Sequence, residues 1–284
     1  STVFGNLLSA ETNDDMQELA KSIMPLLSEH GNNITLNEKL FARIKAVYDQ
    51  KDQANLTPEQ SKLLEKVYNS FVRSGANLEG EAKEQYRALS KELSLLTLQF
   101  GENNLKEIND YKLVLTDPAQ LAGLPQSAID AAAETAKEKG VEGWVFTLQA
   151  PSYSPFMTYA SNRDLRCKLY MAYNTKCTHD NETNNLEIVK KLVNTRLAIA
   201  QLLGYSSFAE YNLQERMAEN SGNVYKLLDQ LLDAYTPTAE QEYAEVEALA
   251  RQLEGSDFTV MPWDWSYYSH KLKDRKLSLI HISE

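Results

Sequence analysis

Apolar residues recur at helical spacing along most of this chain. Over residues 14–31 they stand three and four positions apart, as expected for one face of a helix. Asp14 is a residue type that caps helix N-termini, and Gly31 is a type that ends helices. Residues 80–110 continue the pattern without a proline, a length typical of a long helix in a bundle. The pattern predicts helices over both segments.

The segment 57–75 has the clearest helix boundaries. Thr57 precedes Pro58, which suits the first helical position, and Gln60 completes a capping box with Thr57. Gly75 follows the last apolar residue and is expected to end the helix. Local residue types alone therefore predict both ends of this helix.

Two short segments interrupt the helical pattern. Residues 112–117 and 144–150 alternate large apolar side chains with polar or β-branched ones, and each run is followed by a proline. Between them, residues 126–140 are rich in alanine and typical of a helix. We therefore expect a small antiparallel strand pair inserted among helices.

The helical pattern returns after the strand pair, over residues 154–176, 184–205 and 221–255. Pro237 lies within the last of these segments and is expected to kink or break its helix. No low-complexity linker and no repeat of fixed period divides the sequence. The prediction is a mostly α fold in which residues 1–276 form a single domain.

Composition excludes several classes of protein. The 284 residues are 43% hydrophobic and 24% charged, as in globular proteins, and the net charge of −11 argues against a nucleic-acid partner. No apolar run is long enough to cross a bilayer, so no membrane partner is expected. Cys167 and Cys177 are interpreted as reduced thiols, which favours a cytoplasmic location. Residues 1–10 lack a signal-peptide pattern, although a signal peptide upstream of them stays open.

The histidines do not form the pattern of a zinc hydrolase. They are His30, His179, His270 and His281, and no two of them flank a glutamate at the His-Glu-x-x-His spacing. Cys177, His179 and Asp180 match half of a metal site, but no second group of ligands is near, so a solvated loop is favoured. His30 stands near the end of a predicted helix, where a cation interacts favourably with the helix dipole.

Other catalytic patterns are also missing from the sequence. There is no Gly-x-Ser-x-Gly nucleophile turn and no glycine-rich phosphate loop. The densest acidic run is typical of an exposed helix face, and it consists of Glu240, Glu242, Glu245 and Glu247. We therefore predict that this chain holds no catalytic, cofactor-binding or metal-binding residues of its own.

Three stretches, taken in chain order, resemble one protein family. Residues 143–176 carry a Thr-Leu-x-x-Pro strand end and an Asn-Arg-x-x-Arg helix start, and the matching positions are Thr147, Leu148, Pro151, Asn162, Arg163, Arg166, Tyr170, Ala172 and Tyr173. Residues 202–232 supply a Leu-Gly-Tyr turn and an "ERMA" element, and residues 262–268 read "PWDWSYY". Together they resemble the thimet-oligopeptidase-like zinc metallopeptidases, most closely the bacterial oligopeptidase A and dipeptidyl carboxypeptidase branch.

The resemblance implies a mostly α, two-lobed fold with a deep channel between the lobes. This chain would be the helical lobe N-terminal to the zinc site, incomplete at both ends. In that family a His-Glu-x-x-His helix and a downstream glutamate bind Zn, and the glutamate between the histidines acts as general base. None of those positions has a match here, so no zinc ligand or catalytic residue is carried over.

The function that the resemblance implies belongs to a longer protein. The parent would be a zinc-dependent oligopeptidase or peptidyl-dipeptidase that hydrolyses short peptides. This fragment would contribute a wall of the substrate channel, be inactive alone, and have the missing catalytic half of the same chain as its partner. The alternative is a non-catalytic helical scaffold that binds a protein or peptide partner.

Four aromatic residues near the end of the sequence surround a single acid. They are Trp263, Trp265, Tyr267 and Tyr268, and the acid is Asp264. Aromatic side chains bury large areas and often join one part of a protein to another. We interpret them as an anchor between this lobe and the catalytic half, and a core patch within the chain is the simpler alternative.

Residues 277–284, "LSLIHISE", break the polar helical character of the residues before them. They resemble the translated read-through of a common sequencing-library adapter. We therefore interpret them as a non-native tail and expect Leu277, Leu279 and Ile280 to pack poorly against the rest.

Overall fold

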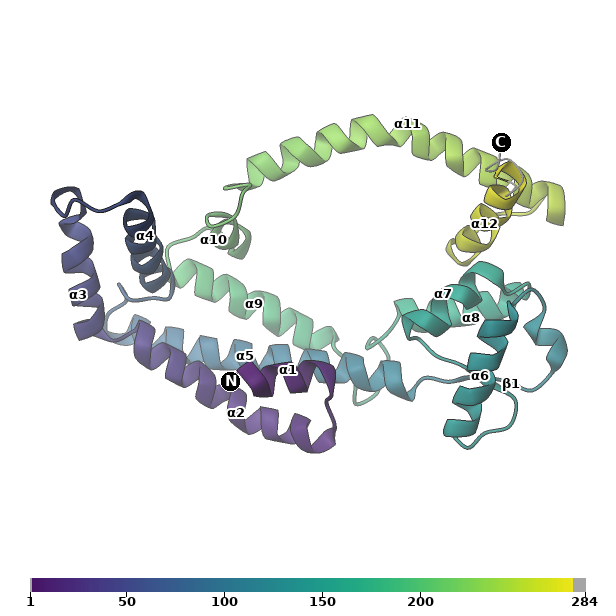
Figure 1. Cartoon of the computed structure of the whole chain (residues 1–284), viewed down its shortest axis with the longest axis horizontal. Helices are drawn as coiled ribbons and strands as arrows, with labels where there is room; N and C mark the ends of the chain where they lie inside the picture. The colour runs from purple at the N-terminus through teal and green to yellow at the C-terminus, as the bar shows by residue number, and fades with distance from the viewer. Residues whose placement is uncertain (1, 278–284) are drawn as a thin grey trace. The chain divides into compact units, whose positions relative to one another are not determined.

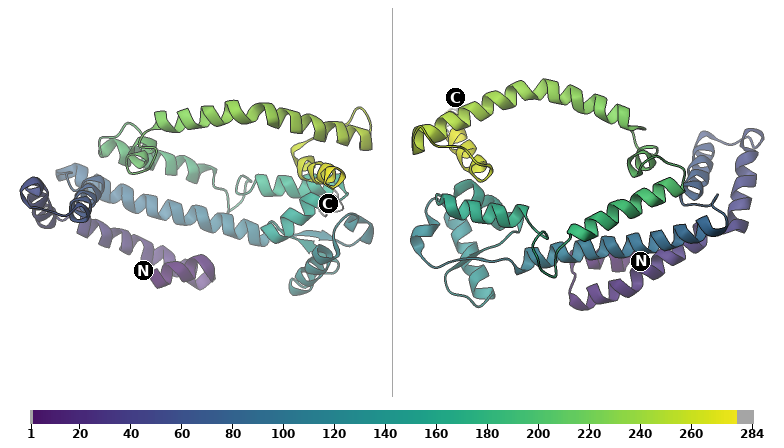
Figure 2. Two further views of the ribbon diagram at one scale, coloured as in Figure 1. Left: turned by 45° about the horizontal axis from the view of Figure 1, so that its top comes forward. Right: turned by 180° about the vertical axis from the view of Figure 1, so that it is seen from behind.

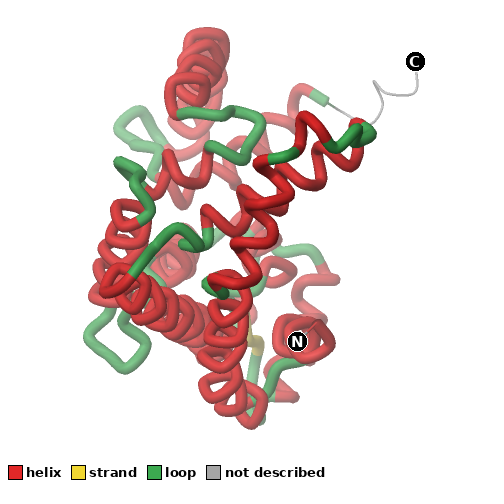
Figure 3. Tube along the Cα trace, turned by 90° about the vertical axis from the view of Figure 1, so that its left-hand side faces the viewer, coloured by secondary structure: helices red, strands yellow, loops and turns green. Residues whose placement is uncertain are grey.

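The computed structural model describes residues 2–277 of the chain. Its helices are α1 (Thr2–Ala10), α2 (Asp14–Thr35), α3 (Glu38–Asp49), α4 (Pro58–Arg73), α5 (Gly80–Asp110), α6 (Gln126–Glu138), α7 (Ala150–Tyr159), α8 (Arg163–Asn174), α9 (Leu186–Leu202), α10 (Phe208–Leu213), α11 (Ser221–Glu254) and α12 (Trp265–Lys276) (Figure 1). Three short 3-10 helices are η1 (Lys51–Gln53), η2 (Pro118–Leu121) and η3 (Pro262–Asp264). Within these described residues, β1 (Leu113–Leu115) and β2 (Trp144–Phe146) form one two-stranded antiparallel sheet (Figure 3). The predicted mostly α fold with a small strand pair is confirmed.

The chain's internal contacts divide it into two compact units. One unit comprises Ser1–Glu102 and Asn185–Val224, and the other comprises Asn103–Asn184 and Tyr225–Glu284. The helices α5 and α11 each run without interruption from residues of one unit into residues of the other, as two further views show (Figure 2). Each unit has its own buried core.

The core of the first unit lies mainly between α5 and α9. Its buried residues Leu36, Tyr86 and Ile199 are packed against partly buried leucines of the same helices and their ends. A second small cluster joins Leu96 of α5 to Ile188 and Leu192 of α9. The apolar stripe of α9 therefore packs on α5 over the part of that helix from Tyr86 to Leu96, as helices in bundles do.

The boundaries of α4 are those predicted from sequence. The Gln60 amide N–H donates to Thr57 Oγ1 at 3.3 Å, and the Thr57 amide N–H donates to Gln60 Oε1 at 3.0 Å. After the helix, Gly75 has φ +87, and the Ala76 amide N–H donates to the Phe71 carbonyl at 3.0 Å. This bond is the Schellman arrangement that a glycine in left-handed conformation permits.

Both predicted ends of the helix over residues 14–31 are wrong. Asn13, not Asp14, is the N-cap, and its side chain accepts the Met16 amide N–H at 2.9 Å. The helix also continues through Gly31, so His30 lies on an exposed helical turn rather than at the helix C-terminus. A glycine inside a helix costs only about 1 kcal/mol relative to alanine. Burial of Leu36 just after the helix end outweighs this cost, since only 3% of Leu36 is exposed.

Of the two outcomes predicted for Pro237, a kink or a break of its helix, the break does not occur. α11 is continuous across this residue, and Figure 1 shows the helix bowed rather than interrupted. A proline removes one backbone donor and frees the carbonyl four residues earlier, here that of Asp233. Asp233 and Pro237 are both exposed, so water can satisfy the freed carbonyl.

The strand pair organises the core of the second unit. Leu113 pairs with Phe146 and Leu115 with Trp144, and Leu113, Leu115 and Phe146 are each at most 2% exposed. These residues pack with Phe156 of α7 and with Leu169 of α8 in one cluster.

Both strands are shorter than the segments predicted for them. β2 ends at Phe146 because the next backbone amide, that of Thr147, donates to the Ser152 hydroxyl at 2.9 Å in the first turn of α7. The chain therefore turns into α7 at a point where the alternating pattern predicted further strand.

Candidate functional site

The most strongly charged buried site of the second unit is centred on Asp264, at the end of η3. Asp264 is fully buried, and two arginines from the first turn of α8, Arg163 and Arg166, reach its carboxylate. Asn162 caps α8 and fixes this turn, because its side chain accepts the Leu165 amide N–H at 3.1 Å. Since the arginines are three residues apart, they lie on the same face of α8.

Both carboxylate oxygens of Asp264 accept hydrogen bonds from the two arginines. Arg163 donates from Nη2 to Asp264 Oδ2 at 2.7 Å and from Nε to both carboxylate oxygens, at 3.0 and 3.1 Å. Arg166 donates from Nη2 to Oδ1 at 2.8 Å, and its remaining donors reach the carbonyls of Ala160 and Trp263, at 2.7 and 3.2 Å. A buried charge that is fully hydrogen-bonded in this way is stable inside a protein.

The arginines also set the charge state of the carboxyl group. Burial alone would raise the pKa of Asp264, but hydrogen bonds from Arg163 and Arg166 outweigh burial and hold this pKa below its ordinary value. The same bond raises the pKa of Arg163. Arg166 lies over the Tyr267 ring at 4.1 Å and Arg163 lies over the Phe258 ring at 4.3 Å, so both cations also contact aromatic faces. Asp264 is therefore ionised near neutral pH and acts as a structural counter-ion.

The aromatic residues around Asp264 hold α12 to its neighbours within the same unit. Trp263 packs against Tyr170 of α8, with ring centroids 6.1 Å apart. Tyr268 is 2% exposed, and its hydroxyl donates to Glu254 of α11 at 2.9 Å. Burial, followed by the contact with Glu254, raises the pKa of Tyr268. The simpler interpretation, a core patch within the chain, therefore accounts for most of the cluster.

Trp265 is the member of the cluster that remains open to solvent. Its indole stacks on the Tyr243 ring with centroids 5.9 Å apart, and 38% of the residue is exposed. An exposed tryptophan beside an exposed tyrosine is the composition that protein contact surfaces favour. Trp265 and Tyr243 are therefore the aromatic residues available for the contact with a catalytic half that was predicted from sequence, and that contact stays a prediction.

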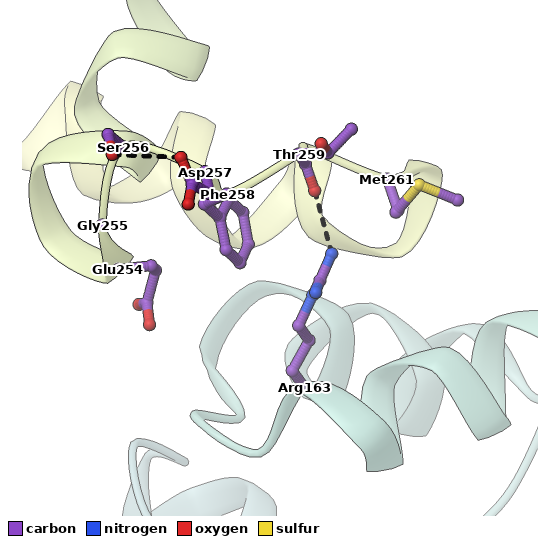
Figure 4. Close-up of a pocket in the computed structure, with 8 residues that line it drawn as sticks. All are labelled: Arg163, Glu254, Gly255, Ser256, Asp257, Phe258, Thr259 and Met261. Carbon is purple, nitrogen blue, oxygen red and sulfur yellow. Dashed lines mark hydrogen bonds between the residues drawn. The ribbon is translucent and has the colours of Figure 1, made fainter.

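A pocket of about 630 Å³ lies beside the arginine–aspartate cluster (Figure 4). Its lining residues are Arg163, Glu254, Gly255, Ser256, Asp257, Phe258, Thr259 and Met261. Arg163 donates to the Thr259 carbonyl at 2.9 Å, and the Ser256 hydroxyl donates to Asp257 at 3.2 Å. No lining residue is a histidine that would activate Ser256, and Asp264 already neutralises Arg163. The pocket lining therefore contains neither a serine activated by a histidine nor an unpaired arginine.

The loop that matched half of a metal site is only partly solvated. His179 and Asp180 are exposed, as expected, but Cys177 is 4% exposed, which corrects the prediction for this residue. The Cys177 amide N–H and the Thr183 hydroxyl both donate to the Glu107 carboxylate at 2.8 Å, and this fastens the loop to the end of α5. Burial, and then the nearby Glu107 charge, raises the pKa of the Cys177 thiol to about 11. A thiol held protonated in this way is a poor metal ligand.

The zinc implied by the family resemblance does not fit the residues that the structure describes. Over residues 2–277, no group of three or more histidine, cysteine, aspartate or glutamate side chains is placed to hold a metal ion. His30 is exposed on α2, and His270 contacts Asp274 at 3.3 Å and the Tyr159 ring. His281 lies outside the described residues. The prediction that this chain binds no zinc of its own stays a prediction.

Most of the proposed tail also lies outside the described residues, namely positions 278–284, including Leu279 and Ile280. Leu277, the first residue of the proposed tail, is 57% exposed.

Among the helices over residues 2–277, none combines the length and the apolar character needed to span a bilayer.

The arginine–aspartate cluster was not predicted from the sequence. In the sequence, Arg163 and Arg166 are residues of one motif and Asp264 is the acid among four aromatic residues, and 101 positions separate Arg163 from Asp264. The available signal was one acid among four aromatic residues, since a carboxylate placed among large apolar side chains requires a cationic partner.

Known proteins match this chain over nearly its whole length. Residues 156–284 match the sequence profile of Peptidase family M3. Oligopeptidase A of Escherichia coli (strain K12) is 33% identical over 278 residues, which cover 96% of this chain and 41% of that protein. Oligopeptidase A of Haemophilus influenzae is 32% identical over 272 residues, covering 94% and 40%, and dipeptidyl carboxypeptidase of Escherichia coli is 31% identical over 280 residues, covering 98% and 41%.

The chain therefore spans about 40% of the length of these curated relatives. The resemblance inferred from three short stretches is confirmed by these matches, which extend well beyond the stretches themselves. By sequence, this chain is similar to oligopeptidase A and dipeptidyl carboxypeptidase over nearly all of its residues, and its second part matches Peptidase family M3.

Proposed function

We propose that this chain is the helical portion, N-terminal to the catalytic zinc site, of a zinc-dependent oligopeptidase or peptidyl-dipeptidase. The observation that carries the proposal is the collinear match of 94–98% of the chain to oligopeptidase A and dipeptidyl carboxypeptidase. In this proposal residues 1–276 form one helical portion and residues 277–284 are a foreign tail. The whole protein hydrolyses short peptides in the cytoplasm, where unpaired Cys167 and Cys177 stay reduced.

In the proposed arrangement the chain contributes structure rather than chemistry. Its helices form part of a wall of the peptide channel, and the zinc ligands and general base come from residues outside this sequence. The absence of a His-Glu-x-x-His pattern from all 284 residues supports this division. The arginine–aspartate cluster then has a positioning role, because it fixes α12 against α8 at the end of the helical portion.

The exposed apolar residues of α9 support a contact with a further part of the protein. One face of α9 packs on α5 through Ile188, Leu192 and Ile199. A second face exposes Val189 and Val193 by 42% and 53%. A helix that is apolar on more than one face is normally covered on each of them. We propose that the catalytic half covers this second face of α9.

The proposal is tested first on the purified chain alone. We expect no hydrolysis of short peptides and far less than one zinc per chain by elemental analysis after dialysis. Near-stoichiometric zinc, or peptide hydrolysis that a chelator abolishes, would contradict the proposal that the zinc ligands and the general base lie outside this sequence. If the chain is inactive and also does not bind the remaining part of a relative's sequence, the non-catalytic scaffold is favoured.

A further inference from the structure

The large apolar side chains of α11 lie in one stripe that is interrupted between Tyr235 and Tyr243, and this stripe is covered only toward the C-terminus, where Leu253 stays 44% exposed. At 100° per residue, the large apolar side chains of this helix fall within one half of its circumference. Val246, Leu249 and Ala250 lie on that half and are at most 4% exposed. Val246 and Ala250 pack in one cluster with Val260 and Tyr268. The stripe is therefore an established packing surface near the end of the helix.

The earlier part of the same stripe is open to solvent. Leu228 is 52% exposed, and Leu232 and Tyr235 are each 65% exposed. Tyr225 and Leu231 are exposed on the same half of the helix. These five large apolar residues fall within eleven positions, which is far denser than the scattered apolar residues of an ordinary protein surface.

A groove joins the open part of the stripe to the covered part. It has a volume of about 520 Å³, and its lining residues are Ala239, Glu242 and Tyr243 of α11 with Val260, Met261, Pro262 and Trp265. The stacked rings of Tyr243 and Trp265 form an aromatic wall. The groove begins at Ala239, four residues after Tyr235 and on the same side of the helix, so the open stripe and the groove together span Tyr225 to Tyr243, about 28 Å of helix at 1.5 Å per residue.

The charges beside this surface are acidic. Between Tyr225 and Tyr243 the helix carries four acids, of which Asp229, Glu240 and Glu242 lie on or beside the apolar side, whereas Asp233 and the one base, Lys226, project from the opposite side. Asp229 and Glu240 project near one edge of the apolar stripe, and Glu242 lies in the groove. A partner with basic residues beside its own apolar face would match this pattern.

We propose that α11, from Tyr225 to Tyr243, docks a partner helix of about five turns whose apolar face is flanked by lysine or arginine. The open stripe receives the apolar face, and the groove at Tyr243 and Trp265 receives one large side chain of the partner. A second copy of this chain would place acids against acids, and an anionic membrane surface would be repelled by the same acids. The inference does not depend on the proposed peptidase function.

The test uses the full chain and a synthetic 20-residue peptide as the probe. The peptide is helical, with leucines on one face and lysines flanking them, and its controls are a glutamate-flanked version and a lysine version with scrambled order. We expect fluorescence anisotropy to show micromolar binding of the lysine peptide that weakens with added salt. Binding at least tenfold weaker is expected for both control peptides.

Three variants locate the binding surface. Leu228→Glu with Leu232→Glu is expected to weaken binding at least tenfold, whereas Leu63→Glu, a leucine 63% exposed on α4, is expected to leave binding unchanged. Asp229→Lys with Glu240→Lys is expected to shift the binding preference toward the glutamate-flanked peptide. Circular dichroism verifies that each variant is folded, and substitutions at such exposed positions should cost little stability.

Several results would overturn the inference. Equal binding of the lysine-flanked and scrambled peptides would indicate charge attraction without docking. Equal loss of binding in the Leu63→Glu variant would place the site elsewhere. Sedimentation that shows a dimer of the unmodified chain, dissociated by Leu228→Glu with Leu232→Glu, would assign the stripe to a second copy instead.

Discussion

Asp264 shows how one side chain determines the geometry of several elements. It is fully buried, and its carboxylate joins α12 to both arginines of the first turn of α8. A buried ion pair adds little net stability compared with apolar residues of the same size, but removal of one partner leaves an uncompensated buried charge. The cluster therefore fixes an arrangement more than it adds stability.

The first prediction concerns removal of this carboxylate. Asp264→Ala is expected to lower the free energy of unfolding by about 3–5 kcal/mol, because Arg166 is 1% exposed and loses its counter-ion. Urea denaturation followed by circular dichroism measures the change. Arg163→Ala is the matched control, since 39% of that side chain is exposed and Arg166 keeps its partner, so its loss should be clearly smaller. Equal midpoints for the unmodified chain and Asp264→Ala would contradict the account.

The second prediction concerns the pH dependence of the same cluster. Because the folded-state pKa of Asp264 is held below its ordinary value, the carboxylate contributes stability above the pKa of an unfolded aspartate, about 3.9. This contribution is lost as the pH falls through the lower, folded-state pKa. The difference in unfolding free energy between the unmodified chain and Asp264→Asn should therefore be constant from pH 7 to 5 and shrink below about pH 4. If this difference in unfolding free energy grew on acidification, the folded-state pKa of Asp264 would be raised rather than lowered, which would contradict the prediction.

The third prediction concerns the thiols. Cys177 is buried, and its pKa is raised to about 11, so its thiol stays protonated at pH 8 and is a weak nucleophile. Cys167 is only partly buried. In the folded chain iodoacetamide should therefore modify Cys167 before Cys177, as followed by mass spectrometry of the two peptides. Faster modification of Cys177 would show that the Glu107 loop opens readily.

At the scale of elements, local residue types predicted some boundaries, and burial decided the others. The Thr57 and Gln60 capping box and the helix stop at Gly75 depend on neighbouring backbone groups, so the sequence contains the whole signal. Gly31 is a weak helix breaker and Pro237 a strong one, yet both lie inside helices. Burial of Leu36 offsets the cost of Gly31, and hydration of the freed Asp233 carbonyl offsets the cost of Pro237. Neither burial nor hydration can be predicted from the adjacent residues alone.

The same distinction explains what was missed at the candidate site. The family motif singled out Arg163 and Arg166, and residue composition marked the aromatic cluster. Their pairing with Asp264 is a contact across 101 positions, which no local pattern contains. Sequence therefore predicted the participating segments but not the ion pair that joins them.

The fourth prediction belongs to the turn before β2. Gly143 has φ +91, and a Cβ there would lie 2.1 Å from the Leu115 carbonyl oxygen. Gly140 also has positive φ, +65, but a Cβ there would meet no atom within 4 Å. Gly140→Ala should cost about 1 kcal/mol through backbone strain alone, and Gly143→Ala should cost clearly more because it forces β1 and β2 apart. Thermal unfolding measures both, and equal costs would contradict the steric account.

At the scale of the whole molecule, the exposed apolar residues are the feature that most needs a partner. Two groups of them have a proposed partner, namely those on the second face of α9 and those along the open stripe of α11. The proposed catalytic half and the proposed docked helix are separate explanations for separate surfaces. Variants of Val193 and of Leu228 therefore test them independently.

The central claim is that this chain serves as the helical portion of an M3-type peptidase. The most direct measurement replaces the aligned segment of Escherichia coli oligopeptidase A, to which 96% of this chain matches, with residues 1–276. The control lacks that segment altogether, and circular dichroism and zinc content verify that the chimera is folded and loaded. We predict that the chimera hydrolyses short peptides in a zinc-dependent manner and that Asp264→Ala reduces this hydrolysis. A folded, zinc-loaded chimera without hydrolysis would contradict the account.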